Sequence, residues 1–315
     1  MIDTLRLYLR KTLLLLWLAG LCFLAFWSCS TLPERGELLL SPDTKRQGKD
    51  GQPGPYGVGL ASWFLQSRVS EGIYTDVLFP ATQEGTLDRT KAPYPCILFV
   101  HGGLVPAKRY RWLAKHFASR GYVVLMPSHL GNLALLEYHN VWLSLRSLRE
   151  KATSSTSNLL SGAIEAKGKS VVMGHSLGGV VSSWLWVERP EITGIAMLAS
   201  WPSDGTNVAA RKGSPVLSII GSNELKESRD KAIEQSKSFQ EPRILGFVKD
   251  MNHYDWTDGT TPEELEIDGP ASSDLPKARR HVFRLLDLWL DATLLESKSA
   301  KDSLAKKSFE GIDLQ

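Results

Sequence analysis

From about residue 61 onward, short apolar runs alternate along the chain with segments of helical spacing. The expected strands are residues 73–79, ended by Pro80, and residues 96–100, 122–126, 170–173, 193–198, 215–220 and 243–248. Helical spacing covers residues 108–120, 177–188 and 276–295. Nearly continuous apolar strands that alternate with helices are typical of a parallel sheet covered on both faces. The pattern therefore predicts an α/β fold with a mostly parallel central sheet.

The N-terminal part of the chain has a different pattern. An apolar run over residues 13–27 follows Arg6, Arg10 and Lys11. The run is shorter than the ~20 residues that cross a membrane comfortably, and it suits the apolar region of an export signal. We therefore expect residues 1–30 to be an export signal or a membrane anchor. A polar linker over 31–60, one folded domain over 61–296 and a polar C-terminal tail over 297–315 complete the predicted organisation.

Cys29 lies between two serines directly after the apolar run. This arrangement resembles a bacterial lipoprotein signal, in which Cys29 would be lipidated after cleavage. The bulky residues Phe26 and Trp27 depart from that pattern, so cleavage, lipidation and retention of the segment stay as alternatives. In each case the pattern predicts an exported protein that is anchored to the cell-envelope membrane through its N-terminus or lies free in the periplasm.

Charge and cysteine content argue against a nucleic-acid partner, an internal disulfide and a cysteine-bound metal. The net charge is +3, and the basic residues are scattered rather than clustered with aromatic residues, so we expect no nucleic-acid partner. Of the three cysteines, Cys22 and Cys29 precede the predicted domain and Cys96 lies inside it. The domain can therefore form no internal disulfide, and the cysteines have no metal-ligand spacing. We expect neither a metal nor an organic cofactor.

Ser176 has a glycine two positions before it and another two positions after it, at Gly174 and Gly178. The stretch before Ser176 reads as a buried strand, and the stretch after it has helical spacing. A chain that passes from strand to helix within one or two residues must turn sharply, and side chains flanking the turn would clash. The pattern predicts a strained turn with Ser176 exposed at its apex, which suits a nucleophile.

A serine nucleophile needs a base, and the base needs an acid to orient it. In an architecture with this turn, the acid and then a histidine follow the serine along the chain. Two histidines follow Ser176, namely His253 and His281. His281 lies inside the closing helix, whereas His253 follows the last predicted strand. We therefore predict His253 as the base.

The acid has two candidates. Glu224 follows the strand over 215–220, where the architecture usually places an aspartate, and it is the favoured candidate. Asp204 follows the preceding strand and is the alternative. Asp250 and Asp255 flank the histidine in the same short loop, where the geometry to orient the imidazole is seldom available.

The charge that develops on a reacting carbonyl oxygen needs hydrogen-bond donors already in place. The backbone N–H of Leu177, at the start of the helix after Ser176, is one predicted donor. The other is expected from Gly103 or Leu104, in the loop after the strand over 96–100. His101 and His175 are interpreted as structural neighbours that hydrogen-bond these loops.

Four segments carry a family resemblance in the right order: residues 101–103, 174–179, 221–224 and 252–253. Together they resemble the alpha/beta-hydrolase superfamily, over about residues 61–295. Within it the chain looks closest to dienelactone hydrolases, platelet-activating-factor acetylhydrolase-like enzymes and bacterial polyester hydrolases. The resemblance implies the alpha/beta-hydrolase fold and a serine hydrolase that cleaves carboxylic esters through an acyl-enzyme. A peptidase or acyltransferase on the same fold, or a catalytically inactive envelope binding protein, are the alternatives.

The substrate is less constrained by the sequence. Residues 129–169 are strongly apolar, and Trp201 follows another predicted strand. These residues favour either an apolar acyl or alkyl pocket or ordinary packing. We expect a small-molecule or lipid ester as substrate.

Overall fold

The computed structural model describes residues 32–49, 51–68, 71–154 and 158–315. The predicted export signal and the lipidation candidate Cys29 lie outside these residues. Within the described ranges, no helix combines the length and the apolar composition needed to cross a membrane.

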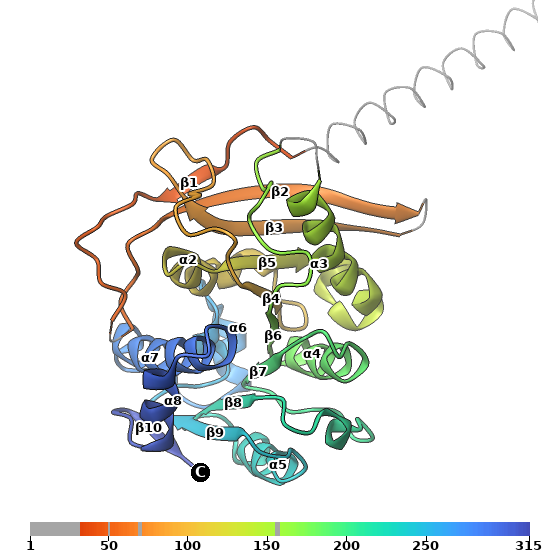
Figure 1. Ribbon diagram of the computed structural model, residues 1–315. Helices are drawn as coiled ribbons and strands as arrows, with labels where there is room; N and C mark the ends of the chain where they lie inside the picture. The colour runs from red at the N-terminus through yellow and green to blue at the C-terminus, as the bar shows by residue number, and fades with distance from the viewer. Residues whose placement is uncertain (1–31, 50, 69–70, 155–157) are drawn as a thin grey trace, which may run out of the picture.

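The described strands form one twisted sheet in the order β1-β2-β3-β5-β4-β6-β7-β8-β9-β10 (Figure 1). Its strands are β1 (Glu37–Leu40), β2 (Gly57–Arg68), β3 (Glu71–Ala81), β4 (Cys96–Val100), β5 (Val123–Ser128), β6 (Ser170–His175), β7 (Gly194–Leu198), β8 (Val216–Gly221), β9 (Arg243–Val248) and β10 (Ile312–Leu314). The strands from β5 to β9 in this order are parallel, and antiparallel strands extend the sheet at both edges. The predicted mostly parallel sheet is confirmed.

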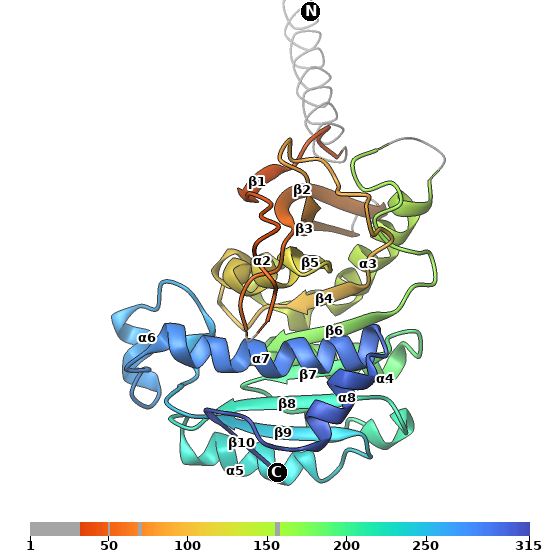
Figure 2. The same cartoon turned by 60° about the vertical axis from the view of Figure 1, so that its left-hand side comes forward.

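Helices cover both faces of the sheet (Figures 1 and 2). They are α2 (Arg111–Ser119), α3 (Tyr138–Thr153), α4 (Leu177–Glu188), α5 (Lys226–Ser236), α6 (Pro262–Ile267), α7 (Leu275–Leu294) and α8 (Lys298–Ala305). Buried residues of α2 and α7 join one core cluster, and those of α3 and α4 join a second cluster on the other face. Helix α5 packs beside that second cluster, over β8 and β9. The sheet is therefore buried on both sides, which explains its nearly continuous apolar strands.

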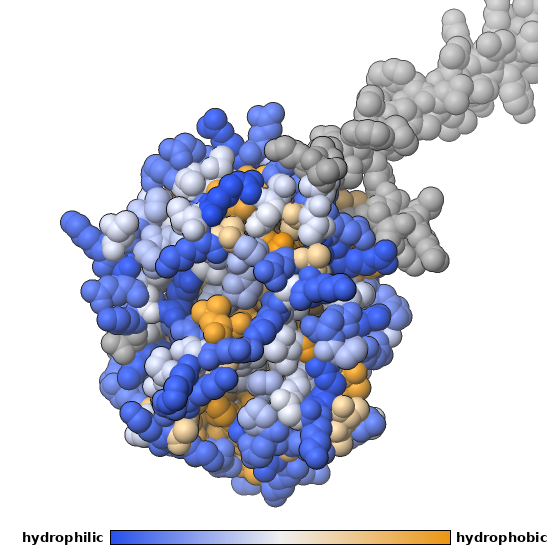
Figure 3. Space-filling model, viewed as in Figure 1, coloured by the Kyte–Doolittle hydropathy of each residue, from blue (hydrophilic) through white to orange (hydrophobic). Residues whose placement is uncertain are grey.

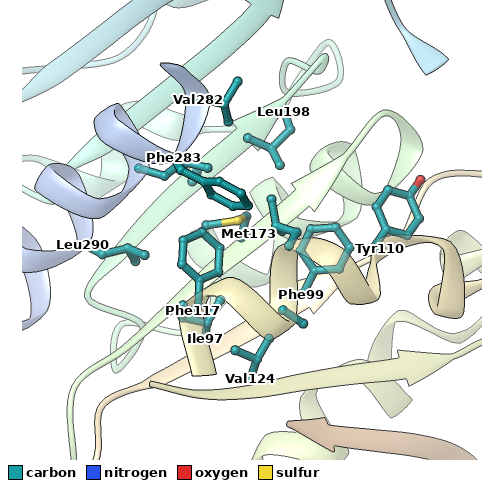
Figure 4. Close-up of a cluster of buried hydrophobic side chains, with 14 of the residues drawn as sticks. Ile97, Phe99, Tyr110, Phe117, Val124, Met173, Leu198, Val282, Phe283 and Leu290 are labelled. Atoms are coloured by element: carbon teal, nitrogen blue, oxygen red, sulfur yellow. The ribbon is translucent and has the colours of Figure 1, made fainter. Parts of the chain in front are cut away.

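Figure 4 shows the core between the sheet and the pair α2 and α7. Phe117 of α2 and Phe283 of α7 meet edge to face with their ring centroids 6.0 Å apart, above Met173 of β6. Aromatic pairs prefer this geometry, and each ring also buries a large apolar area. The core thereby fixes β6, the strand that leads to Ser176, relative to the helices on this face.

The parallel strands position the functional loops. The chain passes from β4 outward to β5 and then returns to β6 on the other side of β4, so the strand order reverses between β4 and β6. In open α/β sheets, ligands bind outside the carboxyl ends of the strands at such a reversal. His101–Gly103 follow β4 and Ser176 follows β6 at this point.

The expected polar linker over 31–60 is wrong in part, because β1 and the start of β2 belong to the sheet. The glycines of this region suggest a linker, but Gly59 lies in β2. A Cβ atom on Gly59 would lie 2.5 Å from the ring of Phe79 in β3. This glycine is therefore a packing requirement. The long antiparallel pair of β2 and β3 was not evident from the apolar pattern.

The strand predicted to end at Pro80 continues to Ala81. β3 pairs with β5 over Tyr74–Leu78 and with β2 along its length. Pro80 lies beyond the part of β3 that pairs with β5, so its missing N–H removes no hydrogen bond on that side. Beyond the pairing with β5, the carbonyl of Pro80 still accepts from the N–H of Asp88 at 2.9 Å, so the proline is compatible with the strand here.

The expected polar tail over 297–315 is also wrong in part, because α8 packs on α7 and β10 pairs with β9. Ile312 of β10 is buried in the core cluster on the face of α2 and α7. A three-residue strand gives almost no periodic signal, which is why the sequence suggested a tail. The face shown in Figure 3 is mostly hydrophilic and has small separate apolar areas.

The C-terminal strand should contribute to stability. Replacing Ile312 with alanine removes a side chain that is 4% exposed, so we expect the free energy of unfolding to fall by roughly 2–3 kcal/mol. Asp313→Ala, an exposed substitution in the same strand, should change it by about 0.5 kcal/mol or less. Urea unfolding of both variants measures the difference. Equal stability of Ile312→Ala and the unsubstituted protein would show that β10 does not belong to the folded core.

Candidate active site

Ser176 occupies the sharp turn between β6 and α4. Its backbone angles are φ 53° and ψ −126°, a conformation that is strained for a residue other than glycine. A Cβ on Gly174 would lie 2.3 Å from the carbonyl oxygen of Gly178, and a Cβ on Gly178 would lie 2.1 Å from that of Val100. No side chain fits at either position, so both glycines are required for the turn. The predicted strained apex is present, and Ser176 is partly exposed there.

Hydrogen bonds hold the strained turn in place. The N–H of Ser176 donates to the carbonyl of Leu198 at 3.0 Å, and the Ser200 hydroxyl donates to the carbonyl of Ser176 at 2.7 Å. Leu198 is the last residue of β7, the neighbouring strand, and Ser200 lies just after it. The backbone of Ser176 is therefore fixed on both sides while its hydroxyl remains available.

Two of the three predicted backbone donors lie together beside the turn. A Cβ on Gly103 would lie 3.1 Å from the side chain of Leu177, so the two residues are adjacent. Among the described residues, neither backbone N–H has a protein acceptor, and Leu177 is the first residue of α4, where N–H groups lack intrahelical partners. The N–H of Leu104 instead donates to the carbonyl of Asn132 at 2.8 Å. Because the N–H of Leu104 is already paired, the geometry favours Gly103 over Leu104 as the second predicted donor beside Leu177.

A chain of hydrogen bonds joins this loop to His253. The N–H of Gly102 lies 3.1 Å from the Tyr110 hydroxyl, which lies 2.8 Å from Nδ1 of His175. Nε2 of His175 lies 3.1 Å from the carbonyl oxygen of His253. Because a carbonyl can only accept, Nε2 of His175 carries the proton, and its Nδ1 accepts from Tyr110. The predicted structural role of His175 fits this chain, whereas Tyr110 was not recognised in the sequence.

The environment of His175 keeps it neutral. Burial, together with the neighbouring His253, holds the pKa of His175 well below its ordinary value. His101 is also fully buried, and its Nδ1 lies 2.9 Å from the carbonyl of Gly102. Burial lowers the pKa of His101 as well, since the backbone contact offsets only part of the effect. Neither histidine is placed to exchange protons with solvent near neutral pH.

Glu224 contacts His253 across the ends of β8 and β9. Oε2 of Glu224 lies 3.3 Å from Nδ1 of His253, and the N–H of Gly221 donates to Oε1 at 2.8 Å. The Glu224 side chain is 1% exposed and that of His253 is 26% exposed. Each carboxylate oxygen thus has a partner, as a buried charge requires. The Nε2 atom of His253 lies on the opposite edge of the ring.

The alternative acid lies elsewhere. The Asp204 side chain is 81% exposed, and its Oδ1 accepts from Gln235 at 3.0 Å and lies 3.4 Å from Nζ of Lys231. The structure therefore brings Glu224, and not Asp204, to His253. Asp250 and Asp255 also make other contacts: Asp250 accepts from Ser273, and Asp255 accepts from the N–H of Asn252.

Two opposing effects set the pKa of His253. Burial lowers it, and the hydrogen bond and negative charge of Glu224 raise it, with a further increase from Asp268. The carboxylates prevail, so the pKa of His253 lies above its ordinary value. A raised pKa means that Glu224 stabilises the protonated imidazole more than the neutral one.

The apolar segment over 129–169 packs mainly against the sheet. Val141, Leu145 and Leu148 of α3 are fully buried in the core cluster with α4. Trp201 packs against the small cluster around Ile220, beneath α5. Of the two interpretations of these residues, packing is the one that applies to most of them. Leu135 and Leu136 are exceptions, with 44% and 70% of their surface exposed.

Comparison with known proteins supports the fold and class. Residues 96–260 match the model of the alpha/beta hydrolase family, which is just over half of the chain. This range includes the turn at Ser176, the loop after β4, Glu224 and His253. The chain belongs to the alpha/beta hydrolase family, a family of hydrolases. A search among curated proteins gave no match.

The contact between Glu224 and His253 predicts a measurable effect. Glu224→Gln removes the charge that raises the pKa of His253, so this pKa should fall. NMR titration of the histidine ring protons measures the change. Asp204→Asn removes a charge that does not touch the imidazole and should leave the pKa of His253 unchanged. A pKa that moves with Asp204→Asn and not with Glu224→Gln would contradict the observed pairing.

Proposed function

We propose that this protein is a serine hydrolase that cleaves carboxylic esters through an acyl-enzyme, with Ser176 as nucleophile, His253 as base and Glu224 as acid. The observation that carries the proposal is the buried Glu224–His253 contact beside the strained turn at Ser176. The ring centroids of His253 and His175, the residue before the serine, are 4.8 Å apart. A triad is identified by such geometry and roles rather than by sequence position.

The proposed reaction begins with attack of the Ser176 hydroxyl oxygen on the ester carbonyl carbon, and its proton passes to Nε2 of His253. Glu224 at Nδ1 keeps the proton of the neutral ring on that nitrogen and stabilises the imidazolium that forms. The N–H groups of Gly103 and Leu177 bind the negative oxygen of the tetrahedral intermediate. Positive backbone charge at the start of α4 favours the same oxygen.

The intermediate then collapses. The bond between the carbonyl carbon and the alcohol oxygen breaks, and His253 gives its proton to the leaving alcohol. The acyl group remains as an ester on Ser176. A water molecule attacks the carbonyl carbon of this ester while His253 accepts its proton. The bond between that carbon and the Ser176 oxygen then breaks, His253 returns the proton to the Ser176 oxygen, and the free acid leaves. No group beyond the protein and water is needed to balance these steps.

The distribution of exposed apolar side chains supports an apolar ester. Several such residues of the described chain lie in segments that follow the strands leading to the site: Leu104, Leu135, Leu136, Leu225, Leu265 and Ile267. In a parallel sheet these segments gather at the edge that holds Ser176. Exposed apolar groups near a binding site favour ligands with apolar surface. We therefore propose an apolar acyl or alkyl group in the substrate, in either a small molecule or a lipid.

Two finer assignments are proposals of the same kind. The branch of dienelactone hydrolases, platelet-activating-factor acetylhydrolase-like enzymes and polyester hydrolases is proposed from the sequence resemblance. The N-terminal run after basic residues supports export and attachment to the cell-envelope membrane, with Cys29 as the lipidation candidate. No nucleic-acid partner is proposed.

Ser176→Ala should abolish hydrolysis of nitrophenyl esters while the fold stays intact. The substitution removes one partly exposed hydroxyl, so circular dichroism should be unchanged, but it removes the only group proposed to form the acyl-enzyme. Hydrolysis is measured for esters from acetate to palmitate, and the unsubstituted protein should favour the longer acyl chains.

Undiminished hydrolysis by Ser176→Ala would exclude the proposed nucleophile. Cleavage of amides instead of esters would indicate a peptidase, and transfer of the acyl group to an added alcohol would indicate an acyltransferase. A folded protein inactive toward all of these substrates would favour the alternative of a binding protein.

A further inference from the structure

The segment between His253 and α7 crosses both loops of the Glu224–His253 pair. This segment, residues 257–274, includes α6 and then returns toward the site. The Asn252 side chain donates to the carbonyl of Gly269 at 2.8 Å, and the Asn223 side chain donates to the carbonyl of Pro270 at 3.0 Å. One contact is made beside His253 and the other beside Glu224. The segment therefore connects two loops that come from different strands.

Asp268 makes the most direct of these connections. Its Oδ1 accepts from the N–H of Leu225, the residue after Glu224, at 3.3 Å. Its Oδ2 accepts from the N–H of His253 itself. One carboxylate thus bonds the backbone of the loop that carries the acid and the backbone of the residue that carries the imidazole.

The position of Asp268 is itself constrained. It follows α6 directly, and α6 begins with a capping box between Thr261 and Glu264. Glu264 in turn accepts two hydrogen bonds from the Arg109 guanidinium, at 2.7 and 2.8 Å. Both side chains of this ion pair are less than one-fifth exposed. A bidentate pair of this kind fixes geometry, so α6 holds Asp268 in place.

We propose that Asp268 is a positioning residue that sets the distance between Glu224 and His253 by bonding both of their loops. The proposal rests on the proposed function, because the distance matters only if the pair is catalytic. Asp268 does not touch the reacting atoms. It acts through the backbone of His253 and through the residue next to Glu224.

The charge of Asp268 gives this role a distinct readout. Burial lowers the pKa of His253, Glu224 raises it by hydrogen bond and charge, and Asp268 adds to the increase. His175 and Tyr254 also pack against the imidazole. His175 is neutral, and burial raises the pKa of Tyr254. Removal of the charge at Asp268 therefore lowers the pKa of His253.

The test compares Asp268→Asn and Asp268→Ala with Glu266→Gln, all in the full chain. Glu266 is an exposed residue of α6, so its substitution removes the same charge nearby without a contact to either loop. We expect both Asp268 variants to lose between about 10- and 100-fold in kcat/KM for a nitrophenyl ester, because small misplacements of catalytic groups have effects of that size. The acid limb of the pH profile of kcat/KM, which reports the base of the free enzyme, should move to lower pH. Glu266→Gln should match the unsubstituted protein in both measurements.

An unchanged kcat/KM and an unchanged acid limb in folded Asp268→Asn would overturn the proposal. A loss of activity with no movement of the acid limb would also overturn it, because a merely structural role would produce that result. If Asp268→Ala does not fold, Asp268→Asn decides, since its amide keeps the size of the side chain and one acceptor. Failure of the proposed function is seen separately, as ester hydrolysis that persists in Ser176→Ala.

Discussion

The strained backbone of Ser176 is the constraint on which the rest of the site depends. A non-glycine residue in a sparsely populated conformation costs of order 1–3 kcal/mol and persists only when its surroundings enforce it. Here the two flanking glycines leave no side chain at the positions where one would clash, and hydrogen bonds with Leu198 of β7 and with Ser200 just after it hold the backbone of Ser176 on both sides. The consequence is a hydroxyl at the carboxyl edge of the sheet, directly before the unpaired N–H groups that begin α4.

The other half of the site is assembled by contacts between loops. Glu224 is almost completely buried, which is unfavourable for a carboxylate unless its oxygens are paired. Gly221 and His253 supply the partners, so the fold alone pairs both oxygens of Glu224. The series of hydrogen bonds from Gly102 through Tyr110 and His175 to His253 then connects this half of the site to the loop that carries Gly103. Both halves are fixed by the fold rather than by a ligand.

Strand order explains why the sequence could place the main candidate site residues at one edge of the sheet. Ser176, Glu224 and His253 each follow a strongly apolar strand, and parallel strands bring such positions to one edge. The two flanking glycines of Ser176 predicted the turn for the physical reason that the structure shows. The choice between Glu224 and Asp204 depended on loop conformation, and the extra methylene of the glutamate did not prevent the contact with Nδ1 of His253.

The remaining features depend on approaches between distant segments. Tyr110 and Asp268 are an unremarkable tyrosine and aspartate in the sequence, and their roles arise only when η1 (Ala107–Tyr110) and the segment after α6 meet the loops of the site. The strands β1 and β10 have four and three residues, too few for a periodic signal. The pairing of β2 with β3 was not predicted, because glycines such as Gly59 suggested a flexible linker. The structure shows that Gly59 is instead required by its close packing against the ring of Phe79.

The central claim is that Ser176 is the nucleophile of a hydrolase, and covalent trapping tests it most directly. A fluorophosphonate transfers its phosphonyl group to an activated serine and loses fluoride, leaving a stable adduct. Incubation of the protein with this reagent, followed by intact mass measurement and peptide mapping, locates the adduct. The account predicts one phosphonyl group per chain, on the peptide that contains Ser176. An adduct on another residue, or none on the folded protein, would contradict it.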